Sequence, residues 1–236
     1  MEQVRTLLKN ARSIAVLTGA GVSAESGVPT FRGHNGLWKQ YRPEDLATPE
    51  AFHRDPKLVW EWYDWRRGLI AGVKPNAGHF ALAELERRSP TFTLITQNVD
   101  DLHDDAGSQN VLKVHGSIWV VRCTGCGKER VDRTTPLAEI PPRCSCGELL
   151  RPGVVWFGEP LPPMVWQNAE RAAELADVFL VIGTSALVYP AAGLATLAKR
   201  AGAKVVEINI EETPLSRSID AFLKGPSAEL LPQLMG

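Results

Sequence analysis

The sequence predicts an α/β fold built on a doubly wound parallel sheet, with a helical insert and a small cysteine-bearing insert. Short apolar runs end repeatedly in a glycine or polar turn and are followed by helical patterns, the order expected when helices connect parallel strands. The four cysteines lie between positions 123 and 146, and four of the seven tryptophans lie between positions 38 and 65. A chain of 236 residues is long enough for one large domain with such inserts.

Composition and charge exclude several classes of protein. The hydrophobic fraction of 44% and the charged fraction of 22% are ordinary for a globular chain and argue against intrinsic disorder. The formal net charge is −1, so a nucleic-acid-coating role has no electrostatic support. The apolar stretch Val178–Ala198 is interrupted by glycines and a proline and does not predict a membrane span. The N-terminal residues lack a long apolar leader segment, so we expect a cytoplasmic protein.

The first half of the chain begins with a helix and a buried strand. Residues 3–12 predict a short helix, and Ser13–Thr18 predicts a buried strand because its apolar run is continuous. Residues 36–75 are rich in tryptophan, tyrosine and proline and predict two or three short helices outside the sheet. An amphipathic helix is expected next, over Asn76–Arg88, with its apolar positions at Phe80, Leu82 and Leu85.

The second half repeats the order of strand, polar turn and helix. Strands are predicted over Thr91–Thr96, Val111–His115, Val178–Ile182 and Lys204–Ile208. Helices are predicted within Pro162–Asp177 and after Pro190, and Val154–Phe157 is predicted to resume the sheet-containing fold after the cysteines. We therefore expect three units. The sheet-containing domain would comprise residues 1–35, 76–119 and 153–236, the helical insert residues 36–75, and the cysteine module residues 120–152.

The cysteines have the spacing of a metal site. Cys123 and Cys126 are separated by two residues, and Cys144 and Cys146 by one. Two close thiol pairs seventeen residues apart suit tetrahedral zinc, and four thiolates would fill its coordination shell. We therefore predict one structural zinc ion per chain. The alternative is four reduced, unrelated cysteines, against which their clustering argues.

Polar residues follow the predicted strands and suggest a ligand site. They occur at Gly19–Gly21, Gln97–Asp100, His115–Ser117, Gly183–Ser185 and Asn209. Because the carboxyl ends of parallel strands meet at one sheet edge, these segments should converge, and a dinucleotide needs such a mixture of backbone donors and short polar side chains. Strand, glycine turn and helix start are also the context in which a Rossmann-like fold binds a pyrophosphate.

One feature departs from the pattern of a dehydrogenase. A second strand ending in an acidic residue should follow the glycine turn by about 20 residues. The segment Pro29–Gly33 and the aromatic region follow instead. We therefore expect the turn to wrap a cofactor, and Asn209 becomes the better candidate for the adenosine ribose.

The motifs together resemble the sirtuins, NAD-dependent protein lysine deacylases. The resemblance is carried by the segment Gly19–Gly33, the segment Thr96–His103, the triplet His115–Ser117 and the four cysteines, all in the family order. Tyr63 and Arg66 match the Tyr-x-x-Arg pair of the class III sirtuins, which favour succinyl- and malonyl-lysine. The resemblance runs from about residue 10 to the C-terminus.

The resemblance implies a reaction that consumes NAD. The acyl oxygen attacks C1′ of the nicotinamide ribose as nicotinamide leaves, and the products are free lysine, nicotinamide and 2′-O-acyl-ADP-ribose. His115 takes the position of the general base that acts on a ribose hydroxyl, a role suited to the ordinary pKa of histidine. Acetyl groups, and by Tyr63 and Arg66 also succinyl and malonyl groups, would be removed.

The resemblance also implies the cofactor contacts. Gln97, Asn98 and Asp100 would hold the nicotinamide end, with Asp100 at the carboxamide. Phe31 would shield C1′ from water and Arg32 would meet the phosphates. The full predicted NAD set is Gly19, Ala20, Gly21, Glu25, Thr30, Phe31, Arg32, Trp38, Gln97, Asn98, Asp100, Gly183, Thr184, Ser185, Asn209, Ile210, Glu211 and Ser227.

The predicted partner is an acylated lysine in a protein or peptide, with neither nucleic acid nor membrane. Its backbone would pair as a strand with Val155, Trp156, Phe157, Gly158 and Glu159. Tyr63 and Arg66, three residues apart on a helix, would meet the acyl carboxylate in a pocket that Trp62 and Trp65 make otherwise apolar. Spacing alone favours a different interpretation, in which Arg66 and Arg67 form a solvated helix edge and Tyr63 is a core residue.

Two other classes of function stay open. An NAD-dependent oxidoreductase would share the glycine turn and the sheet, but it leaves the aromatic segment and His115–Ser117 unexplained. A non-enzymatic zinc-ribbon binding module would account for the cysteines alone. Formation of NADH would identify the first, and the absence of nicotinamide release with an acylated peptide would favour the second.

Overall fold

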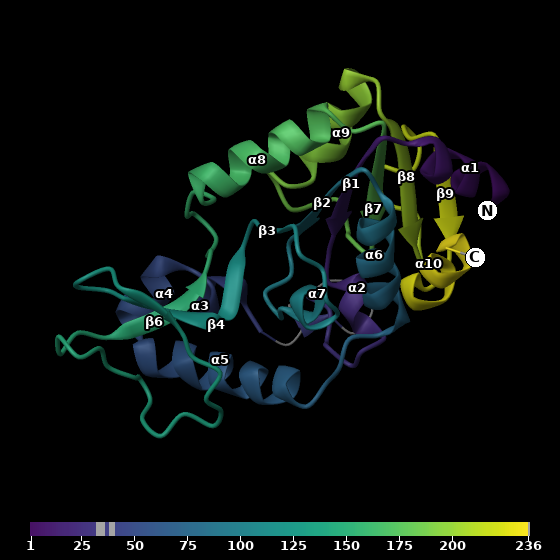
Figure 1. Ribbon diagram of the computed structural model, residues 1–236. Coiled ribbons are helices and arrows are strands. Elements are labelled where there is room, and N and C mark those ends of the chain that lie inside the picture. Colours follow the sequence, from purple (N-terminus) through teal and green to yellow (C-terminus); the bar gives the residue numbers. More distant parts are fainter. Residues whose placement is uncertain (32–35, 38–40, 236) are drawn as a thin grey trace.

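A six-stranded parallel sheet forms the larger part of the computed structural model, which describes residues 1–31, 36–37 and 41–235 (Figure 1). The strand order is β3-β2-β1-β7-β8-β9, and every neighbouring pair is parallel. The strands are β1 (Ser13–Thr18), β2 (Thr91–Thr96), β3 (Val111–Lys113), β7 (Val178–Ile182), β8 (Lys204–Asn209) and β9 (Ala221–Lys224). The predicted doubly wound sheet is confirmed, and β9 is an edge strand that the sequence did not predict.

Helices cover both faces of this sheet. One face packs on α1 (Glu2–Asn10), α6 (Ala77–Arg88) and α10 (Ser227–Met235). The other face packs on α8 (Pro163–Glu174) and α9 (Gly193–Ala201). Alternate residues of one strand serve the two faces, so Ile14 and Val16 contact the first layer while Ala15 and Leu17 contact the second. Within the described ranges, no helix is both long and apolar enough to cross a membrane.

Helix α6 begins where the sequence predicts. One of its three predicted apolar positions is wrong. The Asn76 side chain accepts hydrogen bonds from Gly78 N and His79 N, and His79 Nδ1 accepts from Asn76 N, which completes a capping box. Leu82 and Leu85 are buried as expected. Phe80 is 52% exposed, so its predicted place on the apolar face is wrong, because the helix turns it toward solvent.

A smaller lobe lies beside the carboxyl ends of β1 and β2 (Figure 1). It contains a three-stranded antiparallel sheet with the order β5-β4-β6 and the helices of the aromatic segment. Its elements are α3 (Pro43–Leu46), α4 (Pro49–Arg54), α5 (Pro56–Ala71), β4 (Gly116–Cys123), β5 (Glu129–Val131) and β6 (Leu150–Val154). Helical and cysteine-bearing segments share one apolar core, which includes Trp60, Trp62, Ile118 and Leu150.

Helix α5 carries most of the aromatic residues of this core. Trp60, Trp62 and Tyr63 are buried, whereas Trp65 is 42% exposed and does not join them. Arg66 and Arg67 are 6% and 0% exposed, so the interpretation of these residues as a solvated helix edge is wrong. The apolar environment predicted around position 63 is therefore supplied by Trp62 and not by Trp65.

Two buried polar side chains fasten α5 to the three-stranded sheet. Arg67 Nε donates to Ile118 O on β4 at 3.0 Å, and its Nη2 donates to Asp132 O just after β5. Trp60 Nε1 donates to Leu150 O on β6 at 2.7 Å. Burial lowers the pKa of Arg67, while the nearby Asp132 carboxylate opposes this shift. The helix is thus tied to the sheet by groups that would be costly to leave unpaired.

We expect Arg67→Met to destabilise the chain by about 2–4 kcal/mol, because the buried Ile118 O and the part-buried Asp132 O lose a charged donor. The measurement is the free energy of unfolding in a denaturant titration. Arg200→Met is the matched control, since Arg200 is exposed, and it should change stability by no more than about 0.5 kcal/mol. Equal effects of the two substitutions would contradict the anchoring role of Arg67.

Candidate functional site

The turn after β1 and the turn after β7 pack backbone against backbone. Gly21 N donates to Gly183 O at 2.7 Å, and Gly19 N donates to Ile182 O at 3.0 Å. A Cβ atom on Gly19 would lie 2.8 Å from Thr184 Cα, and one on Gly21 would lie 2.7 Å from Gly183 Cα. Gly183 also has a φ of 59°, a conformation that favours glycine. The contact therefore requires glycine at these positions.

Three polar side chains from separate strands are linked along this edge. Gln97 Nε2 donates to Thr184 Oγ1 at 3.2 Å, and Asn209 Nδ2 donates to Thr184 O at 2.9 Å. Gln97 follows β2, Thr184 follows β7 and Asn209 ends β8. The structure thus brings together residues that the sequence placed at the carboxyl ends of parallel strands.

His115 lies at the same edge and is held in one tautomer. Its Nδ1 lies 3.1 Å from Gln97 O. A carbonyl oxygen only accepts, so Nδ1 carries the proton and Nε2 keeps its lone pair. Burial lowers the pKa of His115, and the hydrogen bond to Gln97 opposes this shift in part. The neutral imidazole is therefore favoured near neutral pH, with Nε2 able to accept a proton.

Asn98 and Asp100 are buried beside the glycine turn. Asn98 Nδ2 donates to Gly19 O and to Ser23 Oγ, each at 3.1 Å. Asp100 Oδ1 accepts from Leu102 N at 3.0 Å, and the residue is 4% exposed. Burial raises the pKa of Asp100, while the Leu102 hydrogen bond opposes the shift. Both side chains are thus fixed within the protein next to the predicted cofactor turn.

The remaining predicted cofactor residues have varied surroundings. Glu25 Oε1 accepts from Ala228 N at 3.0 Å and from Ser227 Oγ at 3.4 Å, so these two predicted contacts meet each other at the start of α10. Ile210 and Glu211 are exposed after β8, and Thr30 O accepts from Leu37 N at 2.9 Å. Two predicted residues, Arg32 and Trp38, lie outside the described residues.

The predicted substrate segment is a turn that contacts both lobes. Val155 N donates to His115 O and Phe157 N donates to Ala47 O, each at 2.9 Å, while Trp156 N donates to Glu159 Oε2 at 2.8 Å. The Phe157 side chain is 43% exposed, and Gly158 has a φ of 87°. Three successive N–H groups are thus used internally, so a paired peptide would have to use the carbonyl groups or later donors of this turn.

Tyr63 and Arg66 lie one helical turn apart on α5. The Tyr63 hydroxyl accepts a hydrogen bond from Trp156 Nε1 at 3.0 Å, and burial raises the pKa of Tyr63 to about 12. The Arg66 guanidinium carbon lies 4.6 Å from the centre of the Phe31 ring and 5.0 Å from that of Trp62. Among the described residues, no hydrogen bond or ion pair satisfies this guanidinium. Burial lowers the pKa of Arg66, while Tyr63 and Asp100 oppose the shift.

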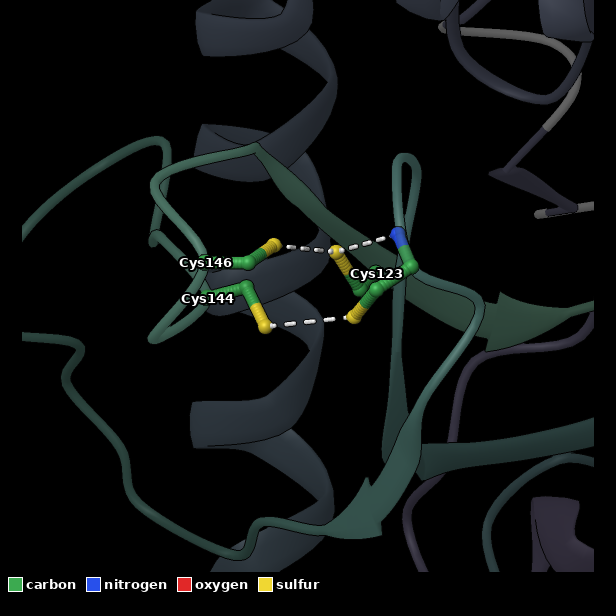
Figure 2. Close-up of side chains that lie close together, drawn as sticks. Cys123, Cys144 and Cys146 are labelled. Carbon is green, nitrogen blue, oxygen red and sulfur yellow. Dashed lines mark hydrogen bonds between the residues drawn. The ribbon is translucent and has the colours of Figure 1, made fainter.

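The four cysteines form a compact sulfur cluster (Figure 2). Their sulfur atoms lie within 4.8 Å of one another, with Cys123 and Cys146 at 3.4 Å and Cys126 and Cys144 at 3.8 Å. Four sulfurs at the zinc–sulfur bond length of about 2.3 Å stand about 3.8 Å apart, so the donor set fits one tetrahedral zinc ion. The backbone N–H of Cys126 lowers the pKa of the Cys123 thiol and favours the thiolate that zinc requires. The predicted four-cysteine site is confirmed.

The sequence model of the Sir2 family matches residues 19–190, a span that contains the glycine turns, His115 and all four cysteines. The chain belongs to the Sir2 family. The predicted membership among the sirtuins is therefore confirmed.

Curated sirtuin relatives match almost the whole chain. A protein of Aquifex aeolicus named NAD-dependent protein deacylase is 59% identical over 213 residues, which cover 90% of this chain and 89% of the relative. A protein of Pyrobaculum aerophilum named NAD-dependent protein deacylase 2 is 54% identical over 98% of this chain and 93% of the relative. A solved Sir2 homologue in complex with NAD is 51% identical, with a TM-score of 0.94 over 99% of this chain and 92% of that one.

Sequence reasoning about this sirtuin missed a buried polar cluster next to Asn98, whose Nδ2 donates to Ser23 Oγ. His79 Nε2 lies 3.4 Å from Ser23 Oγ, His103 Nε2 lies 2.9 Å from Thr18 Oγ1, and the two rings are 4.8 Å apart. Burial lowers the pKa of both histidines, to about 4 for His79. Ser23 lies in the motif Gly19–Gly33 and His103 in the motif Thr96–His103. Their positions in these two motifs could have identified them as candidate site residues.

We expect purified protein to contain one zinc ion per chain and Cys126→Ser to lose it. A serine oxygen is a poor replacement for a thiolate, and the folding free energy of such sites depends on bound metal. Metal analysis and the thermal unfolding midpoint of the two proteins provide the measurement. Ser145→Ala is the control, because this residue lies between two ligands without being one. Folded wild-type protein that holds no zinc would contradict the assignment.

Proposed function

We propose that the chain is an NAD-dependent protein lysine deacylase that removes acetyl, succinyl and malonyl groups. The observation that carries the proposal is the single edge at which His115, Gln97, Thr184 and Asn209 meet two glycine turns packed on one another. Relatives named NAD-dependent protein deacylase and Sir2 homologues solved with NAD or ADP-ribose support it. The proposed products are free lysine, nicotinamide and 2′-O-acyl-ADP-ribose.

The described residues provide a cradle that suits a dinucleotide. The glycines at positions 19 and 21 let the turn after β1 pack directly on the turn after β7, and a turn between a strand and a helix start is where a dinucleotide's phosphates bind in such folds. Thr184 and Asn209 offer short polar groups for the adenosine half, and Asn98 and Asp100 offer theirs for the nicotinamide half. Bound NAD would supply a ribose carbon that receives the acyl oxygen when nicotinamide departs. The individual contacts stay predictions.

His115 is the proposed general base of the reaction. Its Nδ1–H donates to Gln97 O, so Nε2 is the atom that would take a proton from a ribose hydroxyl. Val155 N donates to His115 O, which places the predicted substrate turn directly beside the base. One backbone contact therefore sets the distance between the acyl-lysine site and the group that moves the proton.

The acyl end of the substrate is proposed to lie against α5, in the segment 36–75. The Arg66 guanidinium is buried against aromatic rings, and among the described residues no carboxylate forms an ion pair or hydrogen bond with it, although the Asp100 carboxylate acts on it electrostatically. A buried guanidinium is stable when a bidentate anion pairs with it, and the carboxylate of a succinyl or malonyl group has that geometry. Acylated lysine in proteins or peptides is thus the proposed partner. A cytoplasmic location likewise stays a prediction.

The test is a set of acetyl-, malonyl- and succinyl-lysine peptides incubated with NAD and analysed by mass spectrometry. Nicotinamide and 2′-O-acyl-ADP-ribose should appear in equal amounts with free lysine. Absorbance by NADH without loss of the acyl group would show an oxidoreductase instead. Zinc-loaded, folded protein that releases no nicotinamide with any peptide would favour a binding module.

We expect His115→Ala to lower kcat/KM by about 10²–10⁴-fold, the usual contribution of a general base. The neutral imidazole is the active form, so wild-type kcat/KM should rise with pH through the pKa of His115. Burial places that pKa below the ordinary value of histidine, so the rise should be complete at a lower pH than for an exposed histidine. The pH profile and NAD binding of both proteins are the measurements. A folded variant with wild-type turnover would overturn the assignment.

We expect Arg66→Met to lower kcat/KM for a succinyl peptide by about 10- to 100-fold relative to an acetyl peptide of the same sequence, because only the former ends in a carboxylate. Arg200→Met is again the control, since this exposed arginine lies on α9. The ratio of kcat/KM values for the two peptides is the measurement. Parallel losses on both peptides would mean that Arg66 serves the fold alone.

A further inference from the structure

The indole of Trp156 lies between the substrate turn and helix α5. The residue is 3% exposed, and its Nε1 donates to the Tyr63 hydroxyl at 3.0 Å. Its own backbone belongs to the turn predicted to pair with the substrate, and Tyr63 is one helical turn from Arg66. The side chain thus connects the turn proposed to hold the peptide backbone with the helix proposed to hold the acyl group.

The direction of this hydrogen bond follows from the chemistry of the two groups. An indole N–H can only donate, whereas a phenol has one proton to donate and two lone pairs that accept. The Tyr63 oxygen is therefore the acceptor, and its proton is not used in the bond. Among the described residues, no acceptor receives the Tyr63 hydroxyl proton. Because burial raises the pKa of Tyr63 to about 12, the phenol keeps that proton near neutral pH.

The indole is itself held in place from both sides. The guanidinium carbon of Arg151 lies 3.5 Å from the centre of its ring, and the Phe52 ring centre lies 5.3 Å away. Arg151 forms two bonds to the Glu159 carboxylate, at 2.5 and 2.8 Å, and Glu159 Oε2 also accepts from Trp156 N. Backbone and ring of Trp156 are thus fixed by one ion pair, so the N–H has little freedom to point elsewhere.

We propose that Trp156 is a positioning residue for acyl-group selection, whose N–H occupies a lone pair of the Tyr63 hydroxyl and directs the hydroxyl proton to the carboxylate of a succinyl or malonyl group. This inference rests on the proposed deacylase function. A hydroxyl that accepts one hydrogen bond becomes a stronger donor in the next, so the chain Trp156–Tyr63–carboxylate is cooperative. Acetyl-lysine has no carboxylate and gains nothing from it.

The first experiment deletes the indole N–H and keeps an apolar ring. For Trp156→Phe, kcat/KM for a succinyl peptide relative to the matched acetyl peptide should fall about 5- to 30-fold, mainly through a higher KM. Incorporation of benzothienylalanine at position 156, which replaces the N–H by sulfur within the same bicyclic shape, should give the same loss without a cavity. Trp166→Phe is the control, because this half-buried tryptophan on α8 contacts a different core.

The second experiment separates action through Tyr63 from a general effect on packing. Tyr63→Phe should lower the same ratio, and adding Trp156→Phe to it should change the ratio by less than about 2-fold, since no hydroxyl remains to direct. Additive losses in the double variant would overturn the proposal. So would equal losses on both peptides in Trp156→Phe, or an unchanged ratio with benzothienylalanine.

These outcomes are distinct from failure of the proposed function. Wild-type protein that releases nicotinamide with the acetyl peptide upholds the deacylase, whatever the variants do to the ratio. Wild-type protein that removes acetyl but not succinyl or malonyl groups overturns the acyl assignment and this inference together. Suppose that the wild-type protein removes both acyl groups, but Trp156→Phe leaves the ratio of kcat/KM for the succinyl and acetyl peptides unchanged. This result overturns only the role of Trp156.

Discussion

The close approach of two backbone turns, after β1 and after β7, is the constraint on which the site depends. Parallel pairing aligns Thr18 with Thr96 and with Ile182, so the three strands end at one level. The Gly21 N–H then meets Gly183 O at a distance that a side chain would prevent. This contact holds the turns after β1 and β7 next to each other. The polar groups that follow the neighbouring strands are therefore close enough to form hydrogen bonds.

The proposed NAD half and the proposed acyl half of the site are built from different parts of the chain. Gln97, Thr184 and Asn209 come from strand ends of the large sheet, whereas Tyr63 and Arg66 come from a helix of the smaller lobe. His115 lies at the junction, where its carbonyl binds the substrate turn and its ring binds Gln97. This one residue therefore links a strand end of the large sheet to the predicted substrate turn.

The sequence was sufficient to predict the parallel strands and the polar residues at their ends. It was not sufficient to predict which side chains are buried by contacts between distant segments. Polar residues that follow parallel strands meet at one edge of the sheet, so the proximity of Gln97 and Asn209 could be predicted, although their individual hydrogen bonds could not. The burial of Arg67 could not be predicted, because its partners Ile118 O and Asp132 O are more than fifty residues away. Phe80 and Trp65 were also misplaced, because neither the apolar pattern of residues 76–88 nor the aromatic composition of residues 36–75 shows which side of each helix meets the core.

Helix α5 has two kinds of buried polar residue, and they serve different neighbours. Trp60 and Arg67 donate hydrogen bonds to backbone carbonyl groups of the three-stranded sheet. Among the described residues, Tyr63 and Arg66, which lie between them on the helix, form no hydrogen bond to that sheet. The hydrogen bonds that tie α5 to the three-stranded sheet thus do not pass through positions 63 and 66. If positions 63 and 66 select the acyl group as proposed, a change of acyl preference could arise at these two positions without the loss of either backbone tie.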